Sequence, residues 1–392
     1  MQTRLLKVAA LVLGTVASGT WSSQAHAQAC GAGFVLNPMG MCVAAAGGGV
    51  SATTAAVGTL QTSASLSTSE VLKVVQQRKD ELSGACPPGL VRRNGQCVTP
   101  QASAGQSASA PRRETPSSLV SSTTNGLGVW ATGYGDYEHQ SNISPGQAVN
   151  PTRTRATGGF LVGTDISRRN VFAPGDLFII GALAGYNHTR STFSDGVAAQ
   201  TQAGGMLGAY LGYVAGRVAL DLTAKYDFFD FEPGIGVPSG ITSIGLVNSS
   251  YALNVNYRIW SAGNQWLEPT AGIRYSRTDM GTEASQFGFS DGDVLRLQSG
   301  LRYGLGERTS YGFLTTTMTG LLYSDVAING FSAPVNTAAP ISKVDEGKVR
   351  VQGILRSKLD YGNGFSNFGE VDMRGCDDYF AIGGKIGLRY EW

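Results

Sequence analysis

The sequence predicts an all-β protein, a 12-stranded antiparallel transmembrane β-barrel preceded by a signal peptide and a short, low-complexity segment with disulfides and one helix. Three observations carry this prediction: alternating apolar and polar side chains, a low charged fraction, and connections that are long and short in turn. The alternation is clearest at the end of the chain, where residues 379–392 read YFAIGGKIGLRYEW. Apolar side chains fill every second position there, as expected for a strand with one oily and one wet face.

The composition suits a membrane barrel better than a soluble enzyme. Only 15% of the 392 residues are charged and 54 are Gly, whereas about 25% of residues are charged in an average soluble protein. After residue 20, no run approaches the roughly 18 to 20 consecutive apolar residues of a membrane helix. The net charge of +2 comes without a basic tract that has interleaved aromatic residues, so nucleic acid is not an expected partner.

Residues 1–27 are predicted to be a secretory signal peptide. A positively charged start precedes an apolar core, and an A-H-A motif that ends at Ala27 offers a small-x-small cleavage site. Cleavage between Ala27 and Gln28 would deliver the mature chain to an oxidising compartment. Cys30 offers a lipoprotein alternative, which is less favoured because the Gln before it matches a lipobox poorly.

Residues 28–98 form a short segment that contains one motif twice. Residues 29–43 and 85–98 both follow A-C-x-x-G-Φ-V, then three or four residues, then G-x-C-V, where Φ is apolar. In an exported chain the simplest pairing of four Cys is local, although three connectivities are open. The disulfide candidates are Cys30 with Cys42 and Cys86 with Cys97. A metal site is the alternative, but no His lies nearby and neither motif contains C-x-x-C.

One helix is expected between the two motifs. Residues 67–70 read S-T-S-E, a capping box, and the apolar stripe that follows runs from Val71 to Leu82 before Gly84. A helix of about four turns is close to the limit of stability in water, so it packs on the loops, pairs with a partner helix, or is marginal alone. Residues 99–125 are expected to be a flexible linker because Pro recurs there.

From Gly126 onward the chain reads as alternating strands, and residues 126–392 are assigned to the barrel. In the clearest cases Leu222 and Tyr226 share one face, while Asp221 and Lys225 share the other. A charge facing lipid costs about 2 to 4 kcal/mol at the membrane midplane, so the charged face is assigned to the lumen. The predicted strands are 127–138, 154–167, 177–190, 200–214, 217–230, 247–261, 265–279, 293–305, 309–325, 347–361, 365–374 and 378–392.

The predicted lumen face is rich in basic residues. Among them are Arg274, Arg296, Arg302, Arg350 and Arg356. Such a wall suits an acidic strand or anions, but more often it is a salt-bridged, hydrated interior. Aromatic residues near the strand ends are predicted to form girdles at the membrane interfaces. These are Tyr226, Trp260, Trp266, Tyr275, Tyr303, Tyr361, Tyr390 and Trp392.

The predicted connections alternate in length. Outer-membrane barrels have short turns on the periplasmic side and longer loops outside, so we expect loops 139–153, 231–246 and 326–346 to be extracellular. The connection 168–176 is the exception, because its place in the order calls for a short turn.

Little in the sequence favours catalysis. His139 and Ser141 lie two residues apart, on one face of a strand, and His188 lies near another strand end. Solvated residues at such rims are far more common than catalytic ones, so no catalytic, cofactor-binding or metal-ligating residue is predicted and no cofactor is expected. The odd cysteine, Cys376, is expected to be a free thiol in a turn.

Several short motifs follow one another in a specific order along residues 126–392. They are GVWATGYGDY at 128–137, GGFLVGTD at 158–165, IGALAGY at 180–186, LGAYLGY at 207–213, LDLTAKY at 220–226, WLEPTAGIRY at 266–275, LRLQSGLRYG at 295–304 and IGGKIGLRYEW at 382–392. Together they resemble the translocator barrel of the autotransporter family. The resemblance implies a 12-stranded barrel that inserts into the outer membrane and helps an N-terminal passenger to reach the cell surface.

The last strand also resembles the signal by which outer-membrane barrels are recognised for assembly. The residues that carry this signal here are Ile386, Leu388, Tyr390 and Trp392. Two features depart from the family: the passenger is very short, and residues 117–125 are poor helix formers where family barrels place a helix that fills the lumen.

The sequence therefore predicts a barrel of the cell outer membrane, without enzymatic activity, that anchors its own short N-terminal segment and displays it at the cell surface. The alternative is a barrel without a passenger that acts as a pore or as a structural or adhesive surface protein, with residues 28–125 in the periplasm. Expected partners are membrane lipid, the barrel-assembly machinery, and a host or surface ligand at the extracellular loops. The protein is expected to be a monomer.

Overall fold

The structure is a computed structural model that describes most of the barrel and short pieces of the N-terminal segment. The ranges described are 34–36, 42–44, 68–73, 75–76, 78, 91–93, 96–98, 125–141, 152–193, 199–234, 240–287, 289–331 and 348–392. The signal-peptide site at Ala27 and Gln28, together with Cys30 and Cys86, lies outside these residues. Within them, no helix has the length and apolar character needed to cross a membrane.

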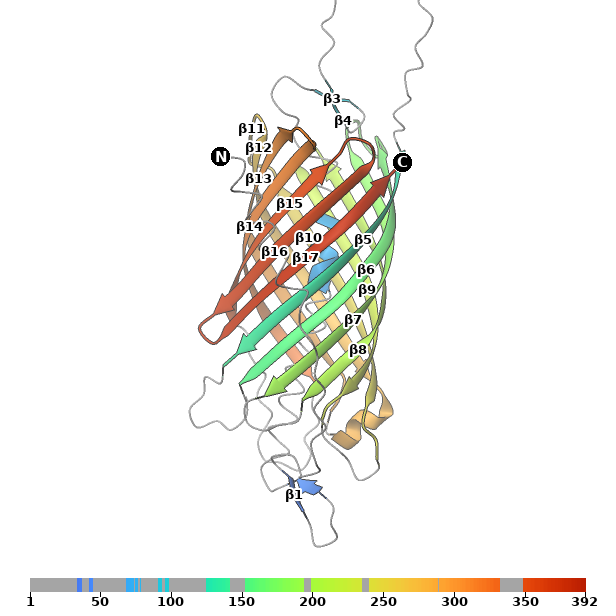
Figure 1. The fold of residues 1–392 in the computed structure, drawn as a ribbon, viewed down its shortest axis with the longest axis vertical. Coiled ribbons are helices and arrows are strands. Elements are labelled where there is room, and N and C mark those ends of the chain that lie inside the picture. The colour runs from blue at the N-terminus through green and yellow to red at the C-terminus, as the bar shows by residue number, and fades with distance from the viewer. Residues whose placement is uncertain are drawn as a thin grey trace, which may run out of the picture.

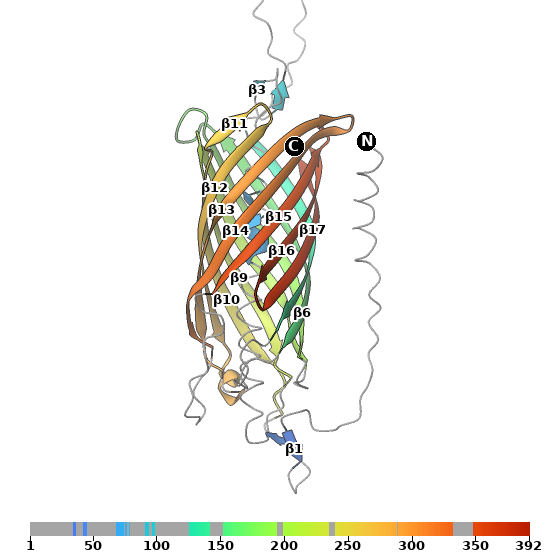
Figure 2. The ribbon, with the colours of Figure 1, turned by 90° about the vertical axis from the view of Figure 1, so that its left-hand side faces the viewer.

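A single antiparallel sheet closes on itself to form the barrel (Figures 1 and 2). The sheet has 13 strands, of which β11 is a three-residue extension beside β12, so 12 strands make up the wall and the predicted fold class is confirmed. The wall strands are β5 (Asn125–Gln140), β6 (Arg153–Arg169), β7 (Leu177–Phe193), β8 (Gln200–Ala215), β9 (Val218–Glu232), β10 (Ile244–Tyr257), β12 (Gln265–Met280), β13 (Gly292–Thr309), β14 (Gly312–Gly330), β15 (Val349–Asp360), β16 (Phe365–Cys376) and β17 (Tyr379–Glu391).

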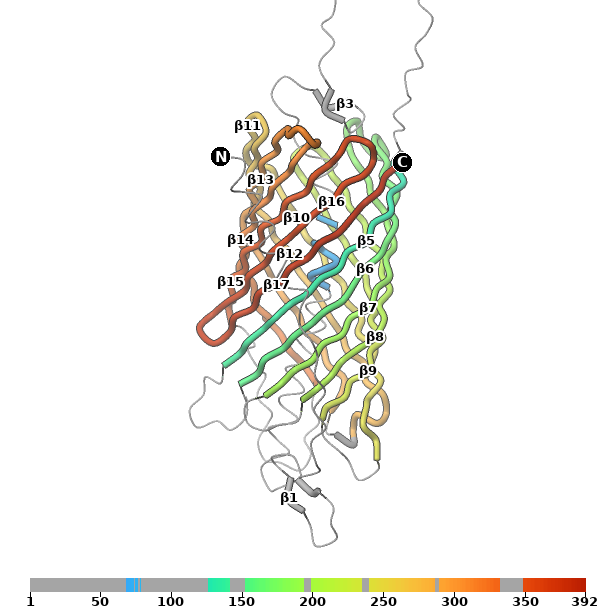
Figure 3. The backbone as a smooth tube through the Cα atoms, viewed as in Figure 1, coloured from blue at the N-terminus to red at the C-terminus, as the bar shows by residue number. Residues whose placement is uncertain are grey.

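Pairing of β17 with β5 closes the barrel. These strands lie side by side along their whole length (Figure 3), and the main-chain N–H of Trp392 donates to the carbonyl of Leu127 at 3.1 Å just beyond the ladder. Closure matters because hydrocarbon offers no hydrogen-bond partners to an open sheet edge. The chain therefore needs its last strand before any of the wall is complete.

The two faces of the wall follow the predicted alternation. In β9, Asp221, Thr223, Lys225 and Asp227 are fully buried inside the barrel, whereas the large apolar residues between them point outward. In β17 the outward residues are Phe380, Ile382, Ile386, Leu388 and Tyr390, and the inward ones include Lys385 and Arg389. These two strands therefore present an oily outer face and a wetter inner face, as a membrane barrel requires.

The connections gather at two different ends of the barrel. One end, called here the short-turn end, has the connections 170–176, 216–217, 258–264, 310–311 and 361–364, together with the start of β5 and the end of β17. The other, called the long-loop end, has 141–152, 194–199, 233–243, 281–291 and 331–348, and also the tight turn 377–378.

The connection 170–176 is a compact folded turn although it is longer than its neighbours. The carboxylate of Asp176 accepts hydrogen bonds from the main-chain N–H groups of Val171, Phe172 and Ala173 at 2.8 to 2.9 Å. Asn170 adopts a left-handed conformation with φ 56° and its side chain accepts from the N–H of Gly175 at 2.7 Å. Side-chain caps replace a short loop here, which explains the exception to the expected alternation.

The prediction that Trp266 belongs to an aromatic girdle at the membrane interface is wrong. Trp266 is only 1% exposed and lies on the lumen side of β12, with the guanidinium carbon of Arg258 5.7 Å from its ring centroid. Because side chains alternate along a strand, its neighbour Leu267 takes the outward position. Nearness to a strand end is therefore not enough to place an aromatic residue in the membrane interface.

A small apolar core lies at the long-loop end. There the short 3-10 helix η1 (Thr282–Phe287) and the residues after it pack against inward-facing residues of four strands, β9, β10, β13 and β14. The buried members are Phe229, Phe231, Ile244, Leu246, Ala284, Phe289, Val294, Ile328 and Phe331. This core ties the β12–β13 connection to the rim.

The two Cys motifs each contain a pair of short antiparallel strands. β1 (Phe34–Leu36) pairs with β2 (Cys42–Ala44), and β3 (Val91–Arg93) pairs with β4 (Gln96–Val98). The repeated sequence therefore gives a repeated backbone pairing, while the disulfides stay predictions because Cys30 and Cys86 lie outside the described residues.

The two-faced wall can be tested with a matched pair of substitutions in β15. Leu355 is half exposed on the lipid face in the middle of the strand, so Leu355→Arg is expected to destabilise the folded barrel by about 2 to 4 kcal/mol. Gln352 points into the lumen and its amide donates to Asp372 at 2.8 Å, so Gln352→Arg keeps a partner and is expected to fold normally. The measurement is the urea midpoint in lipid vesicles, and equal midpoints for the two variants would contradict the assignment of faces.

Candidate functional site

A helix lies inside the barrel. Residues 68–73, 75, 76 and 78 are helical, and two views at right angles place them within the ring of strands (Figures 1 and 2). Of the side chains described in this helix, all are buried except Ser69 and Gln76, which are half-buried. The predicted helix is confirmed, but its place in the lumen was not predicted. We call it the lumenal helix.

The apolar side of the lumenal helix packs against four neighbouring strands, a third of the lumen wall. Val71 and Val75 are both fully buried. Their partners are side chains that point inward from β5, β6, β7 and β8, namely Trp130, Tyr134, Leu161, Leu177, Ile179, Leu183, Met206 and Tyr210. An inward-facing apolar patch is unusual for a hydrated barrel interior, and here the two valines cover it.

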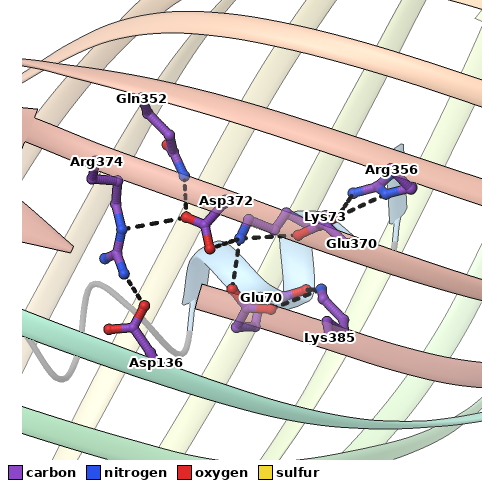
Figure 4. A network of polar contacts seen from close by, with 9 residues as sticks. All are labelled: Glu70, Lys73, Asp136, Gln352, Arg356, Glu370, Asp372, Arg374 and Lys385. Atoms are coloured by element: carbon purple, nitrogen blue, oxygen red, sulfur yellow. Dashed lines mark hydrogen bonds and ion pairs between the residues drawn. The ribbon is translucent and has the colours of Figure 1, made fainter. Parts of the chain in front are cut away.

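The charged side of the helix meets the adjoining stretch of wall, formed by β16 and β17, which follows β5 around the barrel (Figure 4). Glu70 forms an ion pair with Lys385 at 2.8 Å. Lys73 lies 2.8 Å from Glu70, 3.0 Å from Glu370 and 3.4 Å from Asp372. All of these groups are at least nine-tenths buried, so the helix brings its own charges to a wall that is already charged.

The network extends beyond the helix along the wall. Arg356 donates two hydrogen bonds to Glu370 at 2.5 and 2.7 Å, and Arg374 bridges Asp372 and Asp136. Figure 4 shows that these residues surround the first turn of the helix. Buried carboxylates are therefore matched by cations from both the helix and the wall, which is the condition under which buried charges are tolerated.

The other end of the helix is fixed near the short-turn end. Arg78 is 1% exposed and reaches Asp165 at 3.2 Å, Ser167 at 3.3 Å and Glu391 at 2.9 Å. Glu391 is the last residue of β17, whereas Lys385, the partner of Glu70, is in its middle. The helix therefore runs from the middle of the lumen at residue 70 toward the short-turn end at residue 78.

Asp165 links the charged and apolar parts of the site. It accepts a hydrogen bond from the Tyr210 hydroxyl at 2.7 Å and pairs with Arg389 at 2.5 Å. The indole N–H of Trp130 in turn donates to the Tyr210 hydroxyl at 3.0 Å. Sequence reasoning missed Asp165, Glu370 and Asp372, although all three are acids at inward positions of predicted strands.

The five arginines predicted to face the lumen are located as follows. Arg296 makes a two-pronged contact with Asp325 at 2.6 and 2.8 Å, and Arg350 lies 3.8 Å from the same carboxylate. Arg302 pairs with Glu268 at 3.1 Å, and Arg274 is 5% exposed. Only Arg356 belongs to the network around the helix. The basic wall is thus largely an ion-paired interior rather than an open anion site.

The predicted rim residues lie away from the lumen. His139 is half-buried near the long-loop end of β5, 3.4 Å from the hydroxyl of Ser141 and 3.3 Å from that of Thr154. His188 is exposed, and the Cys376 thiol donates to Asp378 at 3.1 Å. In a catalytic triad a buried carboxylate orients and stabilises the base, whereas the third group here is a neutral hydroxyl.

The residues of the predicted assembly signal form an unbroken outward-facing row. Ile386, Leu388, Tyr390 and Trp392 are all about half exposed, and the rings of Tyr390 and Trp392 stack with centroids 5.7 Å apart. This row is at the seam where β17 pairs with β5.

The ion pairs that hold the lumenal helix against β16 and β17 can be tested by removing their central cation, Lys73. Lys73→Met leaves Glu70, Glu370 and Asp372 without the ammonium group between them, and breaking such a buried pairing costs about 3 to 5 kcal/mol. We expect the purified protein to show more frequent channel openings in planar bilayers than the unmodified protein. Gln76→Met, at a half-buried position of the same helix, is the control and should leave the conductance unchanged. Identical conductance traces for both variants would contradict a role of Lys73 in holding the helix in the lumen.

Comparison with known proteins agrees with this architecture. Residues 129–317 match the family model described as the autotransporter beta-domain, whereas no curated protein matches the chain in sequence. Among solved structures, the beta domain of the Bordetella autotransporter BrkA is similar with a TM-score of 0.50 at 17% identity, over 67% of this chain and 98% of that one. The translocator domain of NalP from Neisseria meningitidis gives 0.49 at 16% identity, over 68% and 88%.

The similarity to the BrkA structure shows the fold. The match of residues 129–317 to the family model identifies the family. The C-terminal domain of this chain is therefore an autotransporter beta-domain, a 12-stranded barrel of the outer membrane.

Proposed function

We propose that the barrel anchors the chain in the outer membrane and displays residues 28–67, which precede the lumenal helix, at the cell surface. The observation that carries this proposal is the direction of the helix. Arg78 is bonded at the short-turn end and Glu70 lies deeper in the lumen, so the chain before residue 68 leads toward the long-loop end. Long loops of outer-membrane barrels face outside, which makes that end extracellular.

The two-sided fit of the helix favours display over the alternative of an open pore. A conducting barrel needs a water-filled path, whereas this lumen has an apolar patch and a charged wall that each match one side of the helix. Undocking the helix would expose Val71 and Val75 together with their apolar partners and would separate Glu70 and Lys73 from their ion-pair partners on β16 and β17. We propose that the seated helix is the resting state and that it holds the displayed segment in place.

The partners follow from the same arrangement. Lipid covers the outward apolar face, and the row of Ile386, Leu388, Tyr390 and Trp392 is proposed as the element that the barrel-assembly machinery recognises. The extracellular loops 139–153, 231–246 and 326–346, with the displayed segment, are proposed to contact a host or surface ligand. The ion-paired lumen needs no second copy to be complete, which supports a monomer.

We also propose that the barrel has no catalytic role. The His139 and Ser141 pair faces outward at a rim, and the only third group bonded to His139 among the described contacts is the hydroxyl of Thr154. A hydroxyl carries no charge with which to stabilise an imidazolium, so proton transfer from Ser141 gains little.

Display can be tested with an epitope inserted between residues 50 and 51. We expect antibody to bind this epitope on intact cells and added protease to remove it, because the segment lies outside. The control is an epitope fused in the same way to a periplasmic protein, which should be detected only after the cells are permeabilised. An epitope at residue 50 that needs permeabilisation would overturn the display proposal.

The absence of a catalytic role predicts that a fluorophosphonate probe, which labels activated serines, will not react with Ser141. The purified protein is assayed in mixed micelles beside a known serine hydrolase, and the modified residue is sought by mass spectrometry. Labelling at Ser141 that is lost in His139→Ala would show an activated serine and would refute this part of the proposal.

A further inference from the structure

The chain leaves the lumenal helix and enters the first wall strand at the same place. The guanidinium of Arg78 donates to the Ser167 hydroxyl at 3.3 Å, and that hydroxyl donates to the carbonyl of Gly126 at 3.4 Å. Arg78 also bonds Glu391, and a β-carbon on Gly126 would lie 2.5 Å from the same carboxylate. One serine side chain therefore separates the end of the described helix from the start of β5.

Because the two ends lie so close together, the chain between Arg78 and β5 is far longer than the gap that it has to bridge. A residue spans up to about 3.3 to 3.6 Å, so a few residues would join Arg78 to β5. The chain instead places all of residues 79–124 between them. This intervening stretch, called here the excursion, begins and ends at the short-turn end.

The excursion has no free route through the barrel. A chain that left by the long-loop end and returned would have to cross the lumen twice more, beside the helix. The helix already contacts two adjoining stretches of the wall: Val71 and Val75 are fully buried against β5 to β8, and Lys73 is within 3.4 Å of carboxylates on β16. A 12-stranded barrel lies between small barrels filled by side chains and large porins with an open channel, so the lumen is already occupied by a single helix.

We propose that the excursion lies wholly on the periplasmic side, so that the outer membrane separates the two related Cys motifs. This inference rests on the proposed display of residues 28–67. The motif at 29–43, with β1 and β2, is then outside, and the motif at 85–98, with β3 and β4, is in the periplasm. One chain thus presents the same backbone pairing to two compartments, through a single pass of the lumenal helix.

The two Cys motifs differ in the number of charged residues that they contain. Residues 29–43 contain no charged residue, whereas the second motif carries Arg92 and Arg93 at the positions of Leu36 and Asn37. The copy placed in the periplasm therefore carries two positive charges, while the outer copy carries none.

The test uses two variants of the full-length protein, one with an epitope between residues 50 and 51 and one with the same epitope between residues 105 and 106. On intact cells we expect the first epitope to be bound and the second to give only background. After permeabilisation both should be bound equally. Each variant is first checked for heat-modifiable mobility in SDS, which reports a folded barrel.

The possible results separate the two proposals. If both epitopes are bound on intact cells, display stands and the periplasmic excursion is wrong. If neither is bound, the proposed display itself fails and the separation of the motifs fails with it. Binding of the 105 epitope alone would reverse the direction of the helix and refute both.

A second measurement tests the convergence without relying on epitopes. In the double variant Arg78→Cys with Ser167→Cys, a short bifunctional thiol-reactive reagent that replaces the length of the arginine side chain is expected to link the helix to β6, and mass spectrometry identifies the joined peptides against the native cysteines. Gln76→Cys with Ser167→Cys is the matched control and should not link, because Gln76 has a different direction on the helix. A link in the control but not in the Arg78 variant would place the helix end elsewhere.

Discussion

Hydrocarbon offers no hydrogen-bond partner, and every other feature of this barrel depends on that constraint. The wall must close, so the last strand pairs with the first and completes the ladder from Tyr379 to Glu391. Closure creates an interior that lipid cannot reach, and charges such as Asp221 and Lys225 are tolerated only there. The lumen can then be built to fit an occupant. Its apolar patch on β5 to β8 and its charged wall on β16 and β17 adjoin where β5 pairs with β17, and the lumenal helix matches both.

The match explains how a helix that is marginal in water becomes a fixed part of the protein. Val71 and Val75 gain apolar burial against β5 to β8, while Glu70 and Lys73 gain partners on β16 and β17. Arg78 bonds both Asp165 of β6 and Glu391 of β17. Arg78 also brings the helix end to the seam of the barrel, where Glu391 and Gly126 meet. The same contacts that fill the lumen therefore fix the direction of the chain through it, and the direction decides which part of the short N-terminal segment is displayed.

Much of the wall could be predicted from the sequence, because a period of two is a local signal that lipid enforces at every strand. The lumenal helix was predicted as a helix from its capping box and valine stripe, but its location was not, since complementarity between residues 70–78 and β5 to β17 is not local. A clue was present in β7, where Leu177, Ile179 and Leu183 point inward while Ile180 points outward. Apolar residues on both faces break the alternation and indicate an inner patch that needs a cover. The prediction for Trp266 failed for a related reason: it took account of nearness to the strand end but not of which face of β12 the residue occupies. Trp266 shares the inward face with Glu268 and Thr270.

The lumenal helix is held by apolar contacts on one side and ion pairs on the other, and photo-crosslinking in the folded protein tests this arrangement most directly. A photoreactive amino acid at position 71 should be captured by peptides from residues 125–215, which include the apolar wall. The same amino acid at position 73 should be captured by peptides from residues 365–391, the charged wall. Capture of each position by its own wall is the result the account predicts. Capture of both positions by one wall, or no crosslink to the barrel from either, would contradict it.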